Sequence, residues 1–216
     1  MTDIQLRQDV LDELEFEPSI DAASVGVAVD DGVVTLTGHV SSYAQKLAAE
    51  EAARRVRDVR AIVQNIEVRY PSSLKIPDEE IAKRALNSIQ WDVTLPEAKI
   101  NLTVQSGFIT LSGEVPWYYQ RNAAETAVRR IAGVTGVANK ISIEPKVQLG
   151  DVKTKIENAL KRHAEVEAKA IQVSVRNDTV TLDGKVDNWE ERQAVENAAW
   201  SAPGVRSVED HLTITR

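Results

Sequence analysis

The 216-residue sequence contains no cysteine, a single methionine and few aromatic residues, which make up 5% of the chain. Without cysteine, the chain has no disulfide bond, no thiolate metal ligand and no cysteine nucleophile. There is also no run of eighteen apolar residues, so no segment is expected to span a membrane as a helix. The N-terminal segment MTDIQLRQDVLDELEFEP lacks the basic start and apolar stretch of a secretory signal peptide. We therefore expect a cytoplasmic protein, or a periplasmic one if the sequence is that of a mature form.

Basic residues are in the minority, with 26 lysines and arginines against 33 acidic residues and a net charge of −7. The acidic excess is uneven: residues 3–68 carry 13 acidic and 6 basic side chains, whereas residues 78–143 carry 7 of each. Because an acidic chain repels phosphate backbones, we expect no nucleic-acid partner. The segment GVTG at 133–136 fits the GxxG loop of KH RNA-binding domains. That loop joins two helices, whereas this one is expected to join a helix to a strand.

One short motif occurs three times, as GVVTLTGHV at 32–40, GFITLSGEV at 107–115 and DTVTLDGKV at 178–186. When the copies are anchored on Gly38, Gly113 and Gly184, the apolar pattern on both sides aligns without a gap. Internal repetition of this kind overrides any domain count based on length. It predicts three domains at residues 1–70, 78–144 and 149–216. The linkers at 71–77 and 145–148 contain the proline and polar residues typical of connecting segments.

Each repeat has the same succession of hydrophobic periods. Leu6, Val10 and Leu14 lie four residues apart, which predicts an amphipathic helix. The alternating segment VGVAV, a turn at DDG and the segment VVTLTGHV predict a β-hairpin. A second helix and a closing strand complete the unit. We therefore predict an α+β protein of three tandem αββαβ units, each a small three-stranded mixed sheet covered by two helices.

The predicted second helix is rich in alanine. Ala48, Ala52 and Val56 lie four apart and form the expected buried stripe, which the other two repeats also contain. In the third repeat, Asp187 is followed by Glu190 three residues later, which is close to a capping box. The second helix is thus expected to begin there.

The glycine of the repeated motif lies where a strand would be expected to carry an apolar side chain. Leu36 and Val40 flank Gly38 at a spacing of two, which predicts that the glycine shares their inward face. A missing side chain on a buried face marks the close approach of another backbone, and the alanine-rich helix is the expected neighbour. A β-bulge or a positive φ angle is the alternative. The predicted close-packing positions are Gly38, Gly113 and Gly184.

These features together resemble the BON domain family. The resemblance rests on the V/I-T-L-x-G strand, the alanine-rich second helix and the closing segments IAGVTGVANKISI and APGVRSVEDHLTI, and it covers nearly the whole chain three times. The first repeat departs from the pattern, with DVRAIVQN where a Gly-Val pair is usual. The family includes osmotically induced periplasmic proteins and other bacterial envelope proteins. The resemblance implies a binding module without catalytic activity, for which a phospholipid surface is the usual suggestion.

The side chains that carry chemistry form no recognisable catalytic or metal-binding pattern. His39, His163 and His211 fall at three different positions of the repeat, and none has partners at metal-ligand spacing. The sequence has no nucleophile elbow around a serine and no phosphate-binding loop. We therefore predict that the protein is not an enzyme and needs no cofactor or metal.

Aromatic residues are the best indication of a contact surface. Tyr43, Tyr118 and Trp189 share one aligned position at the start of the second helix, where packing is one interpretation. The second repeat has further aromatic residues there, and Phe16 aligns with Trp91 near the end of the first helix. Aromatic side chains favour membrane interfaces and protein interfaces. The predicted contact residues, for a membrane or a protein partner, are Trp117, Tyr118, Tyr119, Trp91 and Trp189.

Two functional hypotheses follow. The first is a binding or scaffold module related to osmotic stress that binds a phospholipid or membrane surface. The alternative is a cytosolic ion-responsive or protein-interaction module, because one cytosolic branch of the family pairs a BON domain with a LysM domain in potassium sensing. The sequence predicts neither the oligomeric state nor the arrangement of the three units.

Overall fold

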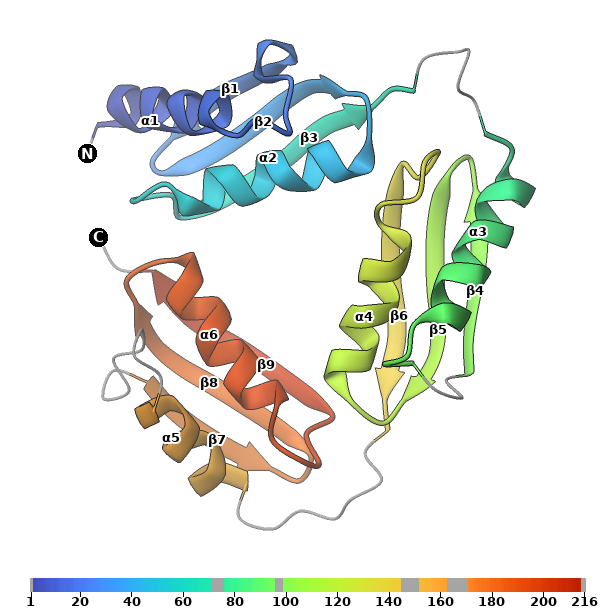
Figure 1. Cartoon of the computed structure of the whole chain (residues 1–216). Helices are drawn as coiled ribbons and strands as arrows, with labels where there is room; N and C mark the ends of the chain where they lie inside the picture. The colour runs from blue at the N-terminus through green and yellow to red at the C-terminus, as the bar shows by residue number, and fades with distance from the viewer. Residues whose placement is uncertain (1, 71–75, 96–98, 145–151, 163–170, 215–216) are drawn as a thin grey trace. The chain divides into compact units, whose positions relative to one another are not determined.

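A computed structural model describes residues 2–70, 76–95, 99–144, 152–162 and 171–214 of the chain. These residues form three successive repeats of helix, two strands, helix and strand (Figure 1). The predicted α+β fold with three αββαβ units is thereby confirmed. The predicted linker 145–148, most of the linker 71–77 and His163 lie outside the described residues.

The elements have closely similar lengths in the three repeats. Repeat 1 contains α1 (Asp3–Phe16), the short 3₁₀ turn η1 (Ala22–Ser24), β1 (Val25–Asp30), β2 (Val33–Val40), α2 (Tyr43–Arg55) and β3 (Ala61–Val68). Repeat 2 contains α3 (Asp78–Trp91), β4 (Lys99–Gln105), β5 (Phe108–Val115), α4 (Tyr118–Val128) and β6 (Gly136–Ile143). Repeat 3 contains α5 (Val152–Arg162), β7 (Ile171–Arg176), β8 (Thr179–Val186), α6 (Trp189–Trp200) and β9 (Ser207–Ile214).

Each sheet is mixed and has the hairpin's second strand at its centre. The strand orders are β1-β2-β3, β4-β5-β6 and β7-β8-β9. In repeat 1, β1 and β2 are antiparallel with Val27 opposite Leu36, whereas β2 and β3 are parallel with Val34 opposite Ile62. Repeat 3 has the same two pairings. A parallel pair needs a crossover connection, which the second helix of the repeat provides.

The core of each repeat lies between its sheet and its helices. Leu6, Val10 and Leu14 are buried as predicted, and they pack against Val34 and Leu36 of the central strand. The apolar residues spaced four apart in the helix and two apart in the strand all face this layer. Their burial stabilises the repeat.

The buried stripe of the second helix differs from the prediction. In α2 the buried alanines are Ala49, Ala52 and Ala53, whereas Ala48 and Val56 are only half-buried. Alanines lie on both sides of the buried face of α2, so a spacing of four did not identify that face. Val56 in addition lies beyond the last helical residue.

Helix capping also lies one residue from its predicted place. In α6 the side chain of Asn188 accepts a hydrogen bond from the Glu191 backbone at 2.8 Å. The Glu191 carboxylate accepts one from the Asp187 backbone at 2.7 Å. The expected pair of Asp187 with Glu190 is therefore wrong, because Asp187 precedes the cap residue rather than filling it.

The repeated glycines have a different role from the expected one. Gly38, Gly113 and Gly184 have φ angles of 106°, 129° and 144°, which side chains rarely tolerate. A Cβ at Gly38 would collide with the carbonyl oxygen of Ser24, and one at Gly113 with that of Lys99. Gly38 is exposed rather than buried. The predicted approach of the alanine-rich helix is therefore wrong, and the positive-φ alternative is correct, with the backbone leading into the neighbouring strand as the close contact.

An aspartate at the start of the first helix holds the hairpin turn in repeats 1 and 2. The carboxylate of Asp3 accepts hydrogen bonds from the backbones of Asp31 and Gly32 at 3.0 and 3.3 Å. Asp78 accepts from Ser106 and Gly107 in the same way, at 2.7 and 2.9 Å. The two backbone groups of each turn therefore have a charged acceptor from another element. The sequence-based reasoning missed this contact.

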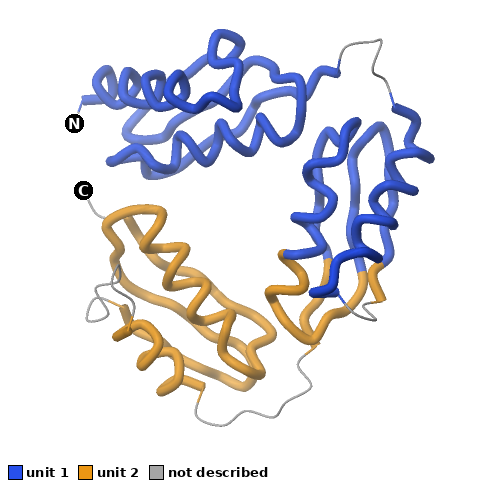
Figure 2. Tube along the Cα trace, in the orientation of Figure 1, with its two compact units in different colours: residues 1–96, 101–112, 123–140 blue, residues 97–100, 113–122, 141–216 orange. Residues whose placement is uncertain are grey.

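The chain's internal contacts divide it into two compact units (Figure 2). One comprises residues 1–96, 101–112 and 123–140, and the other residues 97–100, 113–122 and 141–216. None of the helices in the described ranges is long and apolar enough to cross a membrane.

Candidate contact surface

The five predicted aromatic residues differ in exposure. Trp91 has 84% of its surface exposed and Tyr119 has 55%. Trp117, Tyr118 and Trp189 are half-buried. Trp91 ends α3, whereas the other four lie at the starts of α4 and α6. Trp91 is thus the most exposed of the five predicted contact residues.

Trp91 lies beside a second exposed apolar residue, Val93, which has 90% of its surface exposed. We call Trp91 and Val93 the α3 tip. The Asp92 carboxylate, between them in the chain, accepts hydrogen bonds from the Thr94 backbone at 2.8 Å and from its hydroxyl at 2.6 Å. Leu95 is buried just beyond. The turn is therefore anchored while its two apolar side chains face solvent, and the sequence-based reasoning missed Val93.

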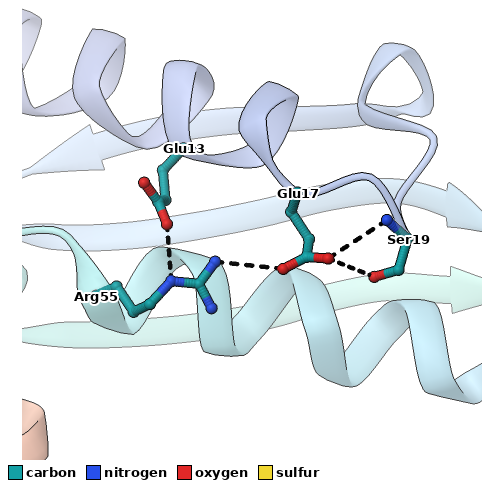
Figure 3. A network of polar contacts seen from close by, with 4 residues as sticks. All are labelled: Glu13, Glu17, Ser19 and Arg55. Carbon is teal, nitrogen blue, oxygen red and sulfur yellow. Dashed lines mark hydrogen bonds and ion pairs between the residues drawn. The ribbon is translucent and has the colours of Figure 1, made fainter.

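Repeat 1 has an exposed aromatic residue at the aligned position, because Phe16 has 83% of its surface exposed. Glu13 and Glu17, on either side of Phe16 in the sequence, belong to a network of polar contacts (Figure 3). The Arg55 guanidinium donates to Glu13 at 2.7 Å and to Glu17 at 3.4 Å, and Glu17 accepts from the Ser19 hydroxyl at 2.8 Å. These contacts join α1 to α2.

The same network shifts two pKa values. Hydrogen bonds from the side chain and backbone of Ser19 lower the pKa of Glu17, and the charge of Arg55 lowers it further. The hydrogen bond with Glu13 raises the pKa of Arg55. Both shifts favour the charged forms, so the network is an ion-paired structural contact at ordinary pH.

The aromatic residues at the helix starts contact other parts of the protein. The rings of Tyr118 and Trp200 are stacked, with centroids 4.3 Å apart and planes within 5° of parallel. The Arg192 guanidinium lies 5.3 Å from the centre of the Trp189 ring. Tyr118 of repeat 2 therefore packs on repeat 3, which agrees with the packing interpretation of its aligned position.

Two tyrosines of repeat 1 contact repeat 2. The Tyr70 hydroxyl donates a hydrogen bond to the Val134 carbonyl at 2.9 Å, and burial raises the pKa of Tyr70. Burial also raises the pKa of Tyr43, as does the Glu125 carboxylate, whereas a hydrogen bond with the backbone of Val137 opposes the shift. Tyr70 and Trp200 were not among the predicted contact residues.

Reactive side chains do not gather in the described part of the chain. There, no three His, Cys, Asp or Glu side chains form a group that could hold a metal ion. His211 and Asp183 are paired at 3.2 Å on the surface of the third sheet, where both side chains are more than half exposed. His39 is also exposed.

Comparison with known proteins gives the same family for all three repeats. The BON domain model matches residues 2–70, 77–145 and 148–216. The chain is 28% identical over 141 residues to "21 kDa hemolysin" of Actinobacillus pleuropneumoniae, covering 62% of this chain and 72% of that protein. It is 26% identical over 145 residues to "Osmotically-inducible protein Y" of Escherichia coli K12, with 65% and 72% covered. It is 23% identical over 141 residues to "Outer membrane lipoprotein DolP" of Haemophilus influenzae, with 62% and 72% covered.

Proposed function

Because the chain belongs to the BON domain family, we propose that it is a non-enzymatic binding module that docks on phospholipid surfaces, with a role in osmotic stress. The names of two relatives support this direction, since one refers to osmotic induction and the other to the outer membrane.

The α3 tip is the observation that carries the proposal. Trp91 and Val93 expose 84% and 90% of their surfaces and lie two residues apart on an anchored turn. A tryptophan side chain favours the headgroup region of a bilayer, and a neighbouring aliphatic side chain adds apolar area that water would otherwise cover. Because the turn is already held in place, docking orders few additional groups.

Charge favours the second repeat as the docking repeat. Residues 78–143 carry 7 acidic and 7 basic side chains, whereas residues 3–68 have an excess of 7 acidic side chains, from 13 against 6. Anionic lipid repels a negative surface, so the neutral repeat approaches it at lower electrostatic cost. Phe16 has the exposure of Trp91, but Glu13 and Glu17 lie nearby, so we assign it a minor contribution.

Vesicles that contain anionic lipid test the proposal on the full chain. We expect co-sedimentation of the protein and a blue shift of its tryptophan fluorescence. The variant Trp91→Ser/Val93→Ser should lose most of the co-sedimentation. Ile4→Ser is the matched control, because Ile4 is 83% exposed but lies at the start of α1. No binding by the wild-type protein, or equal loss in both variants, would refute the lipid surface.

The alternative of an ion-responsive module makes a different prediction. A potassium titration followed by calorimetry and small-angle scattering should then show stabilisation or compaction that sodium does not reproduce. Under the lipid-docking proposal, potassium and sodium have the same effect at equal ionic strength. A potassium-specific change together with failure to bind vesicles would favour the alternative.

A further inference from the structure

Two contacts between neighbouring repeats involve the same aligned positions. In the alignment anchored on the repeated glycines, Tyr43 corresponds to Tyr118, and Arg129 corresponds to Trp200. Tyr118, at the start of α4 in repeat 2, stacks on Trp200, at the end of α6 in repeat 3. One contact therefore joins the start of a second helix to the end of the second helix in the following repeat.

Tyr43 of repeat 1 lies near repeat 2, as Tyr118 of repeat 2 lies near repeat 3. It starts α2, and the groups that act on its hydroxyl include Glu50 of its own helix and, from repeat 2, Glu125, the backbone of Val137 and Arg129. Tyr70 adds a hydrogen bond to the Val134 carbonyl close by in the chain. Arg129 thus lies near Tyr43 at the position that Trp200 occupies for Tyr118.

We propose that these residues form one reusable joint, in which the aromatic residue at the start of a repeat's second helix docks on the end of the second helix in the next repeat. The partner is the following repeat of the same chain. The joint is directional, because its two sides use different surfaces, and such head-to-tail contacts can be used repeatedly along an array. It assigns Tyr43 and Tyr118 to the coupling of repeats rather than to the contact with lipid or partner proteins.

The chemistry of the two joints differs at one side only. At the second joint the ring centroids lie 4.3 Å apart and the two rings are almost parallel, so the rings are closely stacked. Trp200 also packs against the apolar core of its own repeat, so its ring is held in place before it meets Tyr118. At the first joint, an arginine stands at the tryptophan's aligned position, and the Tyr70 hydroxyl donates a hydrogen bond to the Val134 carbonyl at 2.9 Å.

A double-mutant cycle in the full chain separates coupling from local packing. We compare the wild type with Tyr118→Ala, Trp200→Ala and the double variant by differential scanning calorimetry. Each single change should lower the melting temperature by about 2–4 °C. The double variant should lose clearly less than the sum, because either change alone removes the contact. Additive losses would overturn the proposal, since they would assign each residue to its own repeat only.

Backbone relaxation measured by NMR gives a second readout that local packing does not change. In the wild type, repeats 2 and 3 should tumble with one correlation time. Tyr118→Ala should give them separate values while leaving their chemical shifts away from the joint unchanged. Unchanged relaxation in that variant would contradict a coupling role.

A substitution that introduces the tryptophan of the second joint into the first joint tests whether the two joints are equivalent. Arg129→Trp places the residue of the second joint opposite Tyr43, and we expect the melting temperature to rise. Arg130→Trp is the matched control, since it adds the same ring at the next position, which is exposed. Equal effects of the two substitutions would show that the aligned position has no special role.

Discussion

Repeats 1 and 2 have the same element order and sheet order but differ in the residues around the end of the first helix. In repeat 1, Phe16 lies near an ion-paired network that joins α1 to α2. In repeat 2, Trp91 and Val93 are exposed on an anchored turn. We infer that features that both repeats share maintain the fold, and that the exposed α3 tip, which repeat 1 replaces with an ion-paired region, is free to serve binding. The predictions below test this division.

The largest effect is expected at the shared glycines. Gly38→Val and Gly113→Val should each lower the free energy of unfolding by about 3 kcal/mol, because a side chain would be strained at positive φ and would strike a backbone carbonyl. Calorimetry of the full chain measures the loss, with Thr37→Val as a control at the adjacent exposed strand position. A loss in one repeat but not in the other would break the comparison.

A smaller loss is expected at the aspartates that hold the hairpin turns. Asp3→Ala and Asp78→Ala each remove a carboxylate that accepts two backbone hydrogen bonds, so we expect a loss of about 2 kcal/mol in both repeats. Faster hydrogen exchange at Gly32 or Gly107 reports the opened turn. The control is Asp9→Ala on the exposed face of α1, which should leave exchange at the turn unchanged.

Tyr70 provides a prediction specific to the contact between repeats 1 and 2. Tyr70→Phe removes a hydrogen bond to Val134 and should cost about 1 kcal/mol. Burial raises the pKa of Tyr70, so the folded state favours the protonated phenol. This contribution is complete below the ordinary pKa of 10 and is lost as the pH rises through the folded-state pKa. The melting temperature should therefore fall more steeply with rising alkaline pH in the wild type than in Tyr70→Phe. The same pH dependence in both proteins would contradict the role of Tyr70.

The smallest effect is expected at Arg55. Arg55→Gln should lower the melting temperature by roughly 1–2 °C at low salt and less at high salt, because the side chains of its ion pairs with Glu13 and Glu17 are partly exposed to solvent, where salt screens them. The aligned change Arg130→Gln should have no such salt-dependent effect.

Acid should weaken the same network. The pKa of Glu17 is lowered in the folded protein, so its contribution is present above the ordinary pKa of 4.5 and is lost as the pH falls through the folded-state value. Ser19→Ala removes the largest cause of the lowered pKa, so a Ser19→Ala variant whose stability follows the wild-type pH profile unchanged would contradict this assignment.

The fold could be predicted because its signals repeat. Spacings of four and two recur three times in register, so the element order and the first-helix core, including Leu6 and Leu14, were predicted correctly. The role of Gly38 was not, because alternation gives the face of a strand residue but not its φ angle. The stripe of α2 was misplaced by one residue, since alanines surround the true face on both sides.

The contact surface was less predictable than the fold. Alignment identified Tyr118 and Trp91 as unusual, but only the structure separates a stacked ring from an exposed one. The contact of Asp3 with the turn at Gly32 joins residues far apart in the sequence, and no local pattern indicates it. Trp200 could have been found, because it is the aromatic member of an aligned set with Arg54 and Arg129.

Within the described residues, each sheet is formed only by strands of its own repeat. Duplicating or deleting a whole repeat therefore breaks no strand pairing in the sheets of the other repeats. We infer that the gene can gain or lose one complete repeat in a single step. Only the contacts between neighbouring repeats then have to adapt. A small domain can thus become a long array of repeats without new strand pairings, and the sequences of the copies can then diverge.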